Sequence, residues 1–453
     1  MAVPRPSGNV LTTLRDLRRD SLGTFTRLRD EHGMIVRVPV PGARLYLVSD
    51  PAVIQEAMTA TGRTFAKGAG RSSDPDRPGF QPLQRILGMG LLTSAGEHWR
   101  RQRRLINPLF HHARIADYCA VFADLAERTA DGWSDGEVRE MHTELTELTL
   151  AIVGRTVFDV DLDATIMRRI RVWLTENMDT ARRGANTPWS RLLDKVPLPS
   201  TRRWNADRRA LDDLVYQLIA ARRASGATGN DLLSLLLSAQ DAETGERMPD
   251  LDVRDEAVTL LLAGHETTAN ALAWAFHLLG RTPSAQAKLR AELDAVLEGR
   301  LPGAADLPRL PYTRAVFQES MRLYPPAWIT ARRLLAPREV LGYRLPAQCQ
   351  LLMCSWVVHR DARWWPQPEE FRPERWLAKD ADRPRYAYFP FGGGPRQCIG
   401  NGFAEAEGML ALATIFRRWY VTPISDEPIR PRPLITLRPA TTVPMRVSST
   451  LPS

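Results

Sequence analysis

The N-terminal part of the chain opens with a pattern typical of a β-hairpin. Residues 34–50 are rich in β-forming residues and contain a Pro41-Gly42 pair, which predicts two strands joined by a turn. Asp50-Pro51 follows directly, and proline suits the first turn of a helix. We therefore expect strands and then a helix before residue 66.

The middle of the chain has the apolar spacing of helices. From residue 97 to about residue 300 the pattern is mostly helical, with breaks at Pro197, Pro199 and 226–230. Before it, residues 66–93 are rich in Gly, Pro and Ser, which predicts a long loop.

The C-terminal part mixes short elements. Short helices alternate with β-like segments such as 339–354 and with proline-rich coil at 364–396. We find no internal repeat, low-complexity tract or clean linker. The sequence thus predicts one domain over residues 1–453, mainly α with small β-sheets.

The longest predicted helix runs from about Asp252 to Arg281. At 1.5 Å per residue it would be roughly 45 Å long. Gly264 lies in its middle, where glycine costs about 1 kcal/mol relative to alanine. A glycine at such a position indicates that something approaches the backbone closely.

Composition and charge narrow the class of protein. Apolar residues make up 44% and charged residues 25%, as in ordinary globular proteins. The formal net charge is +9, but acidic residues are spread along the chain, so no basic arm for nucleic acid is indicated. No stretch approaches the ~20 apolar residues of a membrane span, and the N-terminus lacks the apolar run of a signal peptide. We expect a cytoplasmic monomer without a membrane anchor.

The four cysteines do not suggest disulfide staples in a chain of this size. Cys119, Cys349 and Cys354 are expected to be buried thiols. Cys398 differs, because it follows the triple glycine 392–394 and precedes an apolar helical pattern. A cysteine at a helix N-terminus tends to have a lowered pKa and to be a thiolate, the form that binds iron. A phosphate-binding loop is the alternative, but the Gly-Lys-Ser/Thr ending of such loops is missing.

Around Cys398 the chain places Phe391, Gly394, Arg396, Gly400 and Ala404 at fixed spacing. This spacing resembles the haem-binding signature of the cytochrome P450 family, and every position of the signature is matched. The resemblance implies the P450 fold, with haem b between the long central helix and the helix after the cysteine, and Cys398 as the axial iron ligand. It also implies that Phe391 shields the sulfur and that Arg396 pairs with a haem propionate.

The predicted long helix carries a second P450-like feature, Glu266-Thr267. A zinc site at His265-Glu266 is excluded because Asn270 stands where a second histidine would be needed. Taken alone, the pair could be an ordinary surface acid beside a threonine. The resemblance implies an acid–alcohol pair that delivers protons to bound dioxygen, with Gly264 leaving room for it.

Charged residues at helical spacing suggest a structural network. Glu319 and Arg322, three residues apart, share a helix face and can pair. The resemblance implies that Arg375 from a later loop joins them and fixes the coil behind the haem. Removing one partner of such a buried network would cost roughly 3–5 kcal/mol.

Other residues resemble P450 cofactor contacts. Trp99 and Arg103, four residues apart, share a helix face, and the resemblance places both at the haem propionates. Arg332 resembles a further propionate arginine, although Arg333 is adjacent. Bidentate contacts with carboxylates suit arginine to this role.

Two surfaces are less sharply defined. Arg100, Arg101 and Arg104 form either a solvated basic face or a docking patch for an acidic electron carrier. The family's pocket walls correspond to the 66–93 loop, the 170–210 region, residues 255–267, Ala327 to Thr330 and the turn near Ile435 to Leu437. The side chains expected to line the substrate pocket, unless they are simply core residues, are Leu262, Ala263, Trp328, Ile329 and Ile435, with Leu261 also conspicuous.

The resemblance implies a monooxygenase that uses O2 and two electrons on a mid-sized lipophilic molecule, as in actinobacterial secondary metabolism. NAD(P)H would supply the electrons through a separate ferredoxin or flavodoxin and its reductase, since we expect no fused reductase. Oxidative coupling or ring closure of a peptide-, terpenoid- or polyketide-derived substrate is the alternative. Peroxide-driven enzymes commonly lack the acid–alcohol pair, and a non-catalytic haem sensor would not need it.

Overall fold

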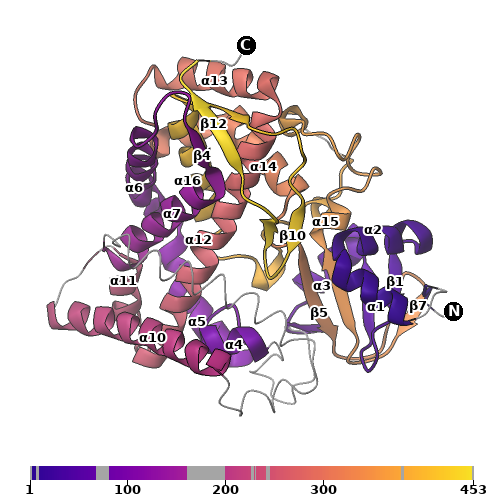
Figure 1. The fold of residues 1–453 in the computed structure, drawn as a ribbon. Coiled ribbons are helices and arrows are strands. Elements are labelled where there is room, and N and C mark those ends of the chain that lie inside the picture. Colours follow the sequence, from indigo (N-terminus) through magenta and orange to yellow (C-terminus); the bar gives the residue numbers. More distant parts are fainter. Residues whose placement is uncertain are drawn as a thin grey trace.

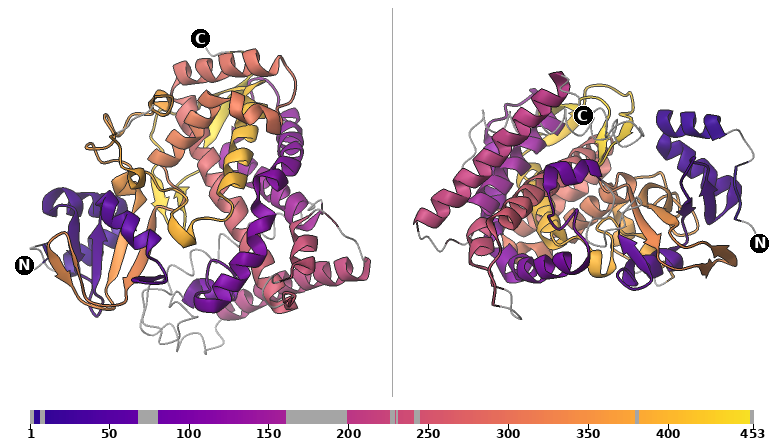
Figure 2. Two further views of the ribbon diagram at one scale, coloured as in Figure 1. Left: turned by 180° about the vertical axis from the view of Figure 1, so that it is seen from behind. Right: turned by 90° about the horizontal axis from the view of Figure 1, so that it is seen from below.

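The structure is a computed structural model that describes residues 3–6, 10–67, 81–160, 199–225, 229, 231–240, 245–378 and 382–450. Helices gather on one side of the molecule, and a sheet flanked by two N-terminal helices lies on the other (Figure 1). The long helix α12 (Asp250–Gly280) runs through the helical side, and the views from behind and below show the same two-part arrangement (Figure 2). This is the mainly α fold with small sheets that the pattern predicted.

Helices account for most of the regular structure. The α-helices besides α12 are α1 (Val10–Arg19), α2 (Ser21–His32), α3 (Pro51–Thr59), α4 (Gln81–Leu87), α5 (Gly96–Ile106), α6 (His112–Asp131), α7 (Met141–Val153), α10 (Pro199–Ser225), α11 (Leu232–Ser238), α13 (Pro283–Leu297), α14 (Pro311–Leu323), α15 (Ser355–Val358) and α16 (Asn401–Phe416). Short 3-10 or π turns are η1 (Asn107–Phe110), η2 (Gly154–Phe158), η3 (Ala304–Arg309), η4 (Pro373–Trp376), η5 (Arg385–Ala387) and η6 (Gly394–Arg396).

The main sheet has five strands in the order β1-β2-β8-β5-β3. Its strands are β1 (Ile35–Val38), β2 (Leu45–Val48), β3 (Phe65–Lys67), β5 (Ile329–Leu334) and β8 (Gln350–Cys354). The predicted 34–50 hairpin is β1 and β2, paired antiparallel. The smaller sheets use β4 (Val138–Glu140), β6 (Arg338–Val340), β7 (Tyr343–Leu345), β9 (Tyr420–Pro423), β10 (Pro431–Pro433), β11 (Leu437–Pro439) and β12 (Pro444–Ser448).

Helix α12 is buried on nearly all sides, and its buried residues include charged side chains such as Arg254, Glu256 and Glu266 as well as apolar ones. Asp250 and Asp252 lie in its first turn, where acidic groups interact favourably with the helix dipole. A Cβ built on Gly264 would lie 3.3 Å from Cγ2 of Val153 on α7. Gly264 therefore allows the close packing of α12 on α7, which is the close approach that the sequence indicated.

One predicted boundary needs correction and another agrees with the structure. The segment 66–93 is not simply a loop, because residues 81–87 form α4 and Phe65–Lys67 form β3. Buried Ile86 and Leu87 give α4 an apolar face that the surrounding glycines and prolines conceal in the sequence. Pro199 begins α10, where proline needs no N–H partner, which agrees with the predicted interruption at this residue. Pro197 and most of 226–230 lie outside the described residues.

Candidate active site

A cavity of about 500 Å³ lies between α12 and the loop that precedes α16. Cys398 lines its floor, while Gly264, Glu266 and Thr267 of α12 line the opposite wall. Apolar side chains dominate the rest of the wall. They include Leu83, Ile86, Leu87, Leu91, Val153, Val157, Leu260, Leu262, Ala263, Ile329 and Ile435.

The loop that carries Cys398 is shaped by its glycines. Gly392 and Gly394 have positive φ values of 68° and 65°. A Cβ on Gly394 would come within 2.2 Å of the backbone oxygen of Met58. Both the positive φ and this contact therefore exclude any residue with a side chain at position 394. The Cys398 N–H donates to the Phe391 carbonyl oxygen over 2.9 Å, which closes the loop and turns the sulfur to the cavity.

The four cysteines differ in burial as the sequence pattern predicted. Cys119, Cys349 and Cys354 are buried, whereas Cys398 is exposed to the cavity. The expected lowering of the Cys398 pKa is wrong for the protein alone. Burial raises that pKa, although the Gly400 N–H and the Arg103 guanidinium act in the opposite direction. A metal ion coordinated by the sulfur would deprotonate the thiol outright.

Four cationic side chains line the same cavity, namely Lys67, Arg103, Arg332 and Arg396. None of the four lies within ion-pair distance of a carboxylate of the described residues. Burial, with Arg332 and Arg103 nearby, lowers the pKa of Arg396 to about 9, and burial lowers that of Arg332 to about 10. Buried cations without counterions favour an anionic ligand. The two carboxylates of haem fit this set, and the neighbouring thiol fits its iron.

Each predicted propionate contact reaches the cavity. Trp99 lines it and stacks under the Arg396 guanidinium, whose carbon lies 3.7 Å from the indole centroid. Arg103 donates to the Gln397 carbonyl oxygen over 3.0 Å, beside Cys398. Of the two adjacent arginines, Arg332 lines the cavity, whereas Arg333 donates to Gln348 in an exposed contact.

Lys67 is a cavity residue that the sequence reasoning missed. Its ammonium donates to the Leu92 carbonyl oxygen, and burial lowers its pKa well below the ordinary value. The rarity of lysine could have drawn attention to Lys67, because only four of the 61 basic residues are lysines. Its position on β3, beside Arg332 of β5, could not be read from the sequence.

The predicted acid–alcohol pair lies on the cavity wall. Thr267 Oγ1 donates to the Ala263 carbonyl oxygen over 2.6 Å, within the helix. Glu266 is 6% exposed and forms an ion pair with Arg438, with 2.8 Å between Arg438 Nη2 and Glu266 Oε1. Arg438 carried no local signal in the sequence, because it lies 172 residues further along the chain.

Of the predicted substrate-pocket residues, Leu262, Ala263, Ile329 and Ile435 line the cavity. Trp328 does not, and this prediction is wrong. Its indole is buried in a core cluster with Phe25, and it donates to the Leu434 carbonyl oxygen over 3.0 Å. The hydrogen bond gives the indole nitrogen a partner only in that orientation. Residues 68–80 and 170–198, which were expected to complete the wall, lie outside the described residues.

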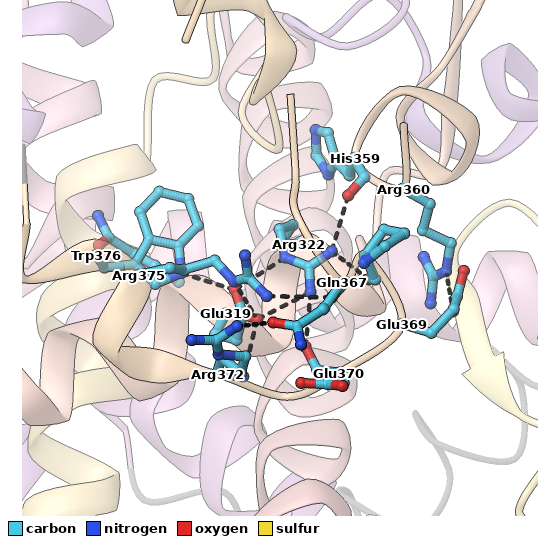
Figure 3. A network of polar contacts seen from close by, with 12 residues as sticks. Glu319, Arg322, His359, Arg360, Gln367, Glu369, Glu370, Arg372, Arg375 and Trp376 are labelled. Atoms are coloured by element: carbon cyan, nitrogen blue, oxygen red, sulfur yellow. Dashed lines mark hydrogen bonds and ion pairs between the residues drawn. The ribbon is translucent and has the colours of Figure 1, made fainter. Parts of the chain in front are cut away.

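Glu319, Arg322 and Arg375 come together in one network of polar contacts (Figure 3). Arg322 and Glu319 have fully buried side chains and lie 2.8 Å apart, and Arg375 donates to Glu319 over 2.9 Å. Trp376 and the Arg372 backbone N–H donate to the same carboxylate. The arrangement ties α14 to η4.

The basic face of α5 is largely paired. Arg100 bonds Glu97 over 2.6 Å, and Arg101 lies 3.0 Å from Glu246. Arg104 lies 4.0 Å from Glu97. Positive charge is therefore partly neutralised here, and the choice between solvated face and docking patch remains a matter for kinetics.

None of the described helices is long and apolar enough to span a membrane.

Comparison with known proteins agrees with this site. The sequence model of the family "Cytochrome P450" matches residues 4–443. Cyclooctatin synthase of Streptomyces melanosporofaciens is 41% identical over 409 residues, 90% of this chain and 87% of the relative. Cyclooctat-9-en-7-ol 5-monooxygenase of the same species is 38% identical over 87% of this chain and 83% of the relative. Pentalenene oxygenase of Streptomyces avermitilis is 33% identical over 93% and 91%. The chain belongs to the cytochrome P450 family and is a haem-dependent monooxygenase related to terpenoid-modifying actinobacterial enzymes.

Proposed function

We propose that this P450 oxidises a cyclic terpenoid of low polarity, using O2 and two electrons from a separate ferredoxin or flavodoxin and its NAD(P)H-dependent reductase. The observation that carries the proposal is the apolar cavity bounded by Cys398 on one side and by Glu266 and Thr267 on the other. A largely apolar wall with few polar groups selects a hydrocarbon or an alcohol over a charged molecule. The related enzymes with terpenoid names support the same substrate class.

The chemistry divides between cofactor and protein. Haem bound at Cys398 supplies the centre at which dioxygen is reduced. The balanced reaction is RH + O2 + 2 e⁻ + 2 H⁺ → ROH + H2O. The protein's part is to hold the cofactor carboxylates with Arg103, Arg332 and Arg396, and to exclude water with the apolar wall. It must also bring two protons to dioxygen.

Proton delivery falls to Glu266 and Thr267. The Thr267 hydroxyl donates to the Ala263 carbonyl oxygen, so its oxygen can still accept from a molecule in the cavity. The Oε2 atom of Glu266 is buried and has no hydrogen-bond partner among the described residues. We assign Oε2 the transfer of a proton from solvent to the cavity, and Thr267 the holding of the molecule that receives it.

The test is a titration of the ferric holoprotein with cyclic terpene hydrocarbons, their alcohols, fatty acids and peptides, followed through the Soret band. We expect a saturable low-to-high-spin shift with the terpenoids, and product formation with a ferredoxin–reductase pair. A shift confined to fatty acids or peptides would contradict the substrate class. Under ¹⁸O2 a hydroxylated product carries label, whereas unlabelled ring closure would favour oxidative coupling.

Two adjacent leucines provide a matched pair of variants. Leu262 lines the cavity and Leu261 does not, although both are buried on α12. Leu262→Ala should change the dissociation constant or the site of oxidation, while Leu261→Ala should lower stability and leave both unchanged. Equal effects on binding would argue against this cavity as the substrate site.

A further inference from the structure

Glu266 is held by residues of a C-terminal hairpin far away in the sequence. Strands β10 and β11 pair antiparallel, with Pro433 opposite Leu437, and residues 434–436 form the turn between them. Arg438 Nε donates to Glu266 Oε1 over 2.9 Å, and its Nη2 lies 2.8 Å from the same oxygen. The Thr436 hydroxyl also donates to Oε1.

The anchoring is confined to one carboxylate oxygen. The contacts from Arg438 and Thr436 all end on Oε1, whereas Oε2 is buried without a partner among the described residues. The Arg438 and Glu266 side chains are only 13% and 7% exposed. A charge-assisted contact at this burial fixes the direction of a carboxylate far better than a solvated pair would.

A polar chain extends the anchor toward the start of α7. Asn270, one helical turn after Glu266, donates to the Thr436 hydroxyl over 3.3 Å. The carbonyl oxygen of its amide lies 2.9 Å from Nε2 of half-buried His142. With His142 as the donor, these hydrogen bonds all point toward Glu266 Oε1, which orients Thr436 as a donor to the carboxylate.

The hairpin turn that anchors Glu266 is itself fixed. The indole of Trp328 donates to the Leu434 carbonyl oxygen over 3.0 Å, and that of Trp274 to the Leu437 carbonyl oxygen over 3.3 Å. The same turn presents Ile435 and Thr436 to the cavity. The carboxylate and one part of the substrate wall therefore share a single support.

We propose that Arg438 is a positioning residue of this enzyme, which holds Glu266 by Oε1 so that Oε2 can pass protons to the cavity. The proposal rests on the proton-delivery role of Glu266 given above. Glu266 gives one proton and regains one from solvent, so the overall balance of the reaction is unchanged. Without Arg438 the carboxylate would rotate or take up a different partner, and protons would arrive late relative to electrons.

The test compares product formed per NAD(P)H consumed in the Arg438→Gln and Arg438→Lys holoproteins. General acid–base catalysis contributes about 10²–10⁴-fold, and misplacement costs a part of it, so we expect a loss of roughly 10- to 100-fold for Arg438→Gln. Released hydrogen peroxide should rise, and the solvent isotope effect in D2O should increase. Arg438→Lys, which keeps the charge but not the fork, should recover part of the coupling.

Arg432 provides the matched control, because it lies opposite Arg438 in the hairpin and is exposed. Arg432→Gln should leave coupling and isotope effect as in the unchanged protein. The substrate-induced Soret shift and thermal midpoint of each variant show whether cofactor and fold are retained. Unchanged coupling in Arg438→Gln, or an equal loss in Arg432→Gln, would overturn the proposal.

Glu266→Gln separates this inference from the proposed function. Loss of coupling in Glu266→Gln with normal coupling in Arg438→Gln would refute the positioning role alone. Normal coupling in Glu266→Gln would refute the proton-delivery role itself. If Glu266 delivers protons and Arg438 positions it, the variant with both substitutions should lose little more coupling than Glu266→Gln alone, since the two residues act through one carboxylate.

Discussion

The buried carboxylate of Glu319 makes the sharpest stability prediction. Arg322 Nε and Nη2 donate to it over 2.9 and 2.8 Å. Arg375, Trp376 and the Arg372 backbone add three more hydrogen bonds. The perturbation is Glu319→Gln, which keeps the shape of the side chain but removes its charge and turns an amide NH2 toward these donors (Figure 3).

The magnitude follows from what the substitution leaves behind. Arg322 would keep its hydrogen bonds to the carbonyl oxygens of His359, Pro368 and Glu370, but its charge would be buried without a counterion. Breaking a buried pair in this way costs about 3–5 kcal/mol. At about 2.1 cal/mol/K per residue, the unfolding entropy of a chain of this size is about 1 kcal/mol/K, so the Tm should fall by about 3–5 °C.

The assay is thermal unfolding of the holoprotein at one fixed scan rate, because large haem proteins often unfold irreversibly. Glu374→Gln is the control, since Glu374 pairs with Lys288 over 2.6 Å on the same side of the molecule but both side chains are exposed. An exposed pair contributes about 0–1 kcal/mol, so its Tm should change by less than about 1 °C. Equal shifts in the two variants would refute the reasoning from burial.

Three further predictions concern the cofactor, the core and the basic face. Arg332→Gln should speed the loss of haem to an acceptor such as apomyoglobin, while Arg333→Gln should not, because only Arg332 lines the cavity; equal rates would contradict the assignment. Burial raises the pKa of Glu407 well above its ordinary value of 4.5, with Thr268 acting against it. The folded protein therefore keeps a proton on Glu407 at pH values where the unfolded chain has lost it. The contribution of Glu407 to the free energy of unfolding is fully present below its pKa in the unfolded chain and is lost as pH rises through its pKa in the folded protein. Glu407→Gln should therefore make the free energy of unfolding, measured in urea, fall less steeply with rising pH. An unchanged dependence on pH would show that Glu407 ionises freely. Reversal of charge at Arg101 and Arg104 should slow reduction by ferredoxin at low salt if the face docks an acidic carrier, and unchanged rates would leave it a solvated face.

Features encoded by local pattern could be predicted from the sequence. The cysteine loop is readable because its glycines and Cys398 are neighbours in the chain. Helix α12 lies close to the predicted range of residues 252–281 because no proline interrupts its helical spacing. Glu319 and Arg322 share one turn of α14, so their pairing is also local. Arg375 could be added only through the resemblance to the P450 family.

What could not be predicted depends on contacts between distant segments. The expected thiolate at Cys398 considered the helix terminus but not the burial that opposes it. Trp328 is apolar and borders a predicted wall, yet its indole nitrogen finds its acceptor, Leu434, 106 residues away and turns the ring from the cavity. Lys67 and Arg438 reach the site through strand pairing, which leaves no local mark in the sequence.

The central claim is that Cys398 binds the iron of a haem in this cavity. It is tested most directly by the absorption spectrum of the ferrous carbon monoxide complex for the unchanged protein, Cys398→Ser and Cys349→Ser. We predict the thiolate-type Soret band for the unchanged protein and for Cys349→Ser, whose thiol is buried directly before β8, and its loss in Cys398→Ser. A thiolate-type band that persists in Cys398→Ser, or is missing from the haem-loaded unchanged protein, would contradict the account.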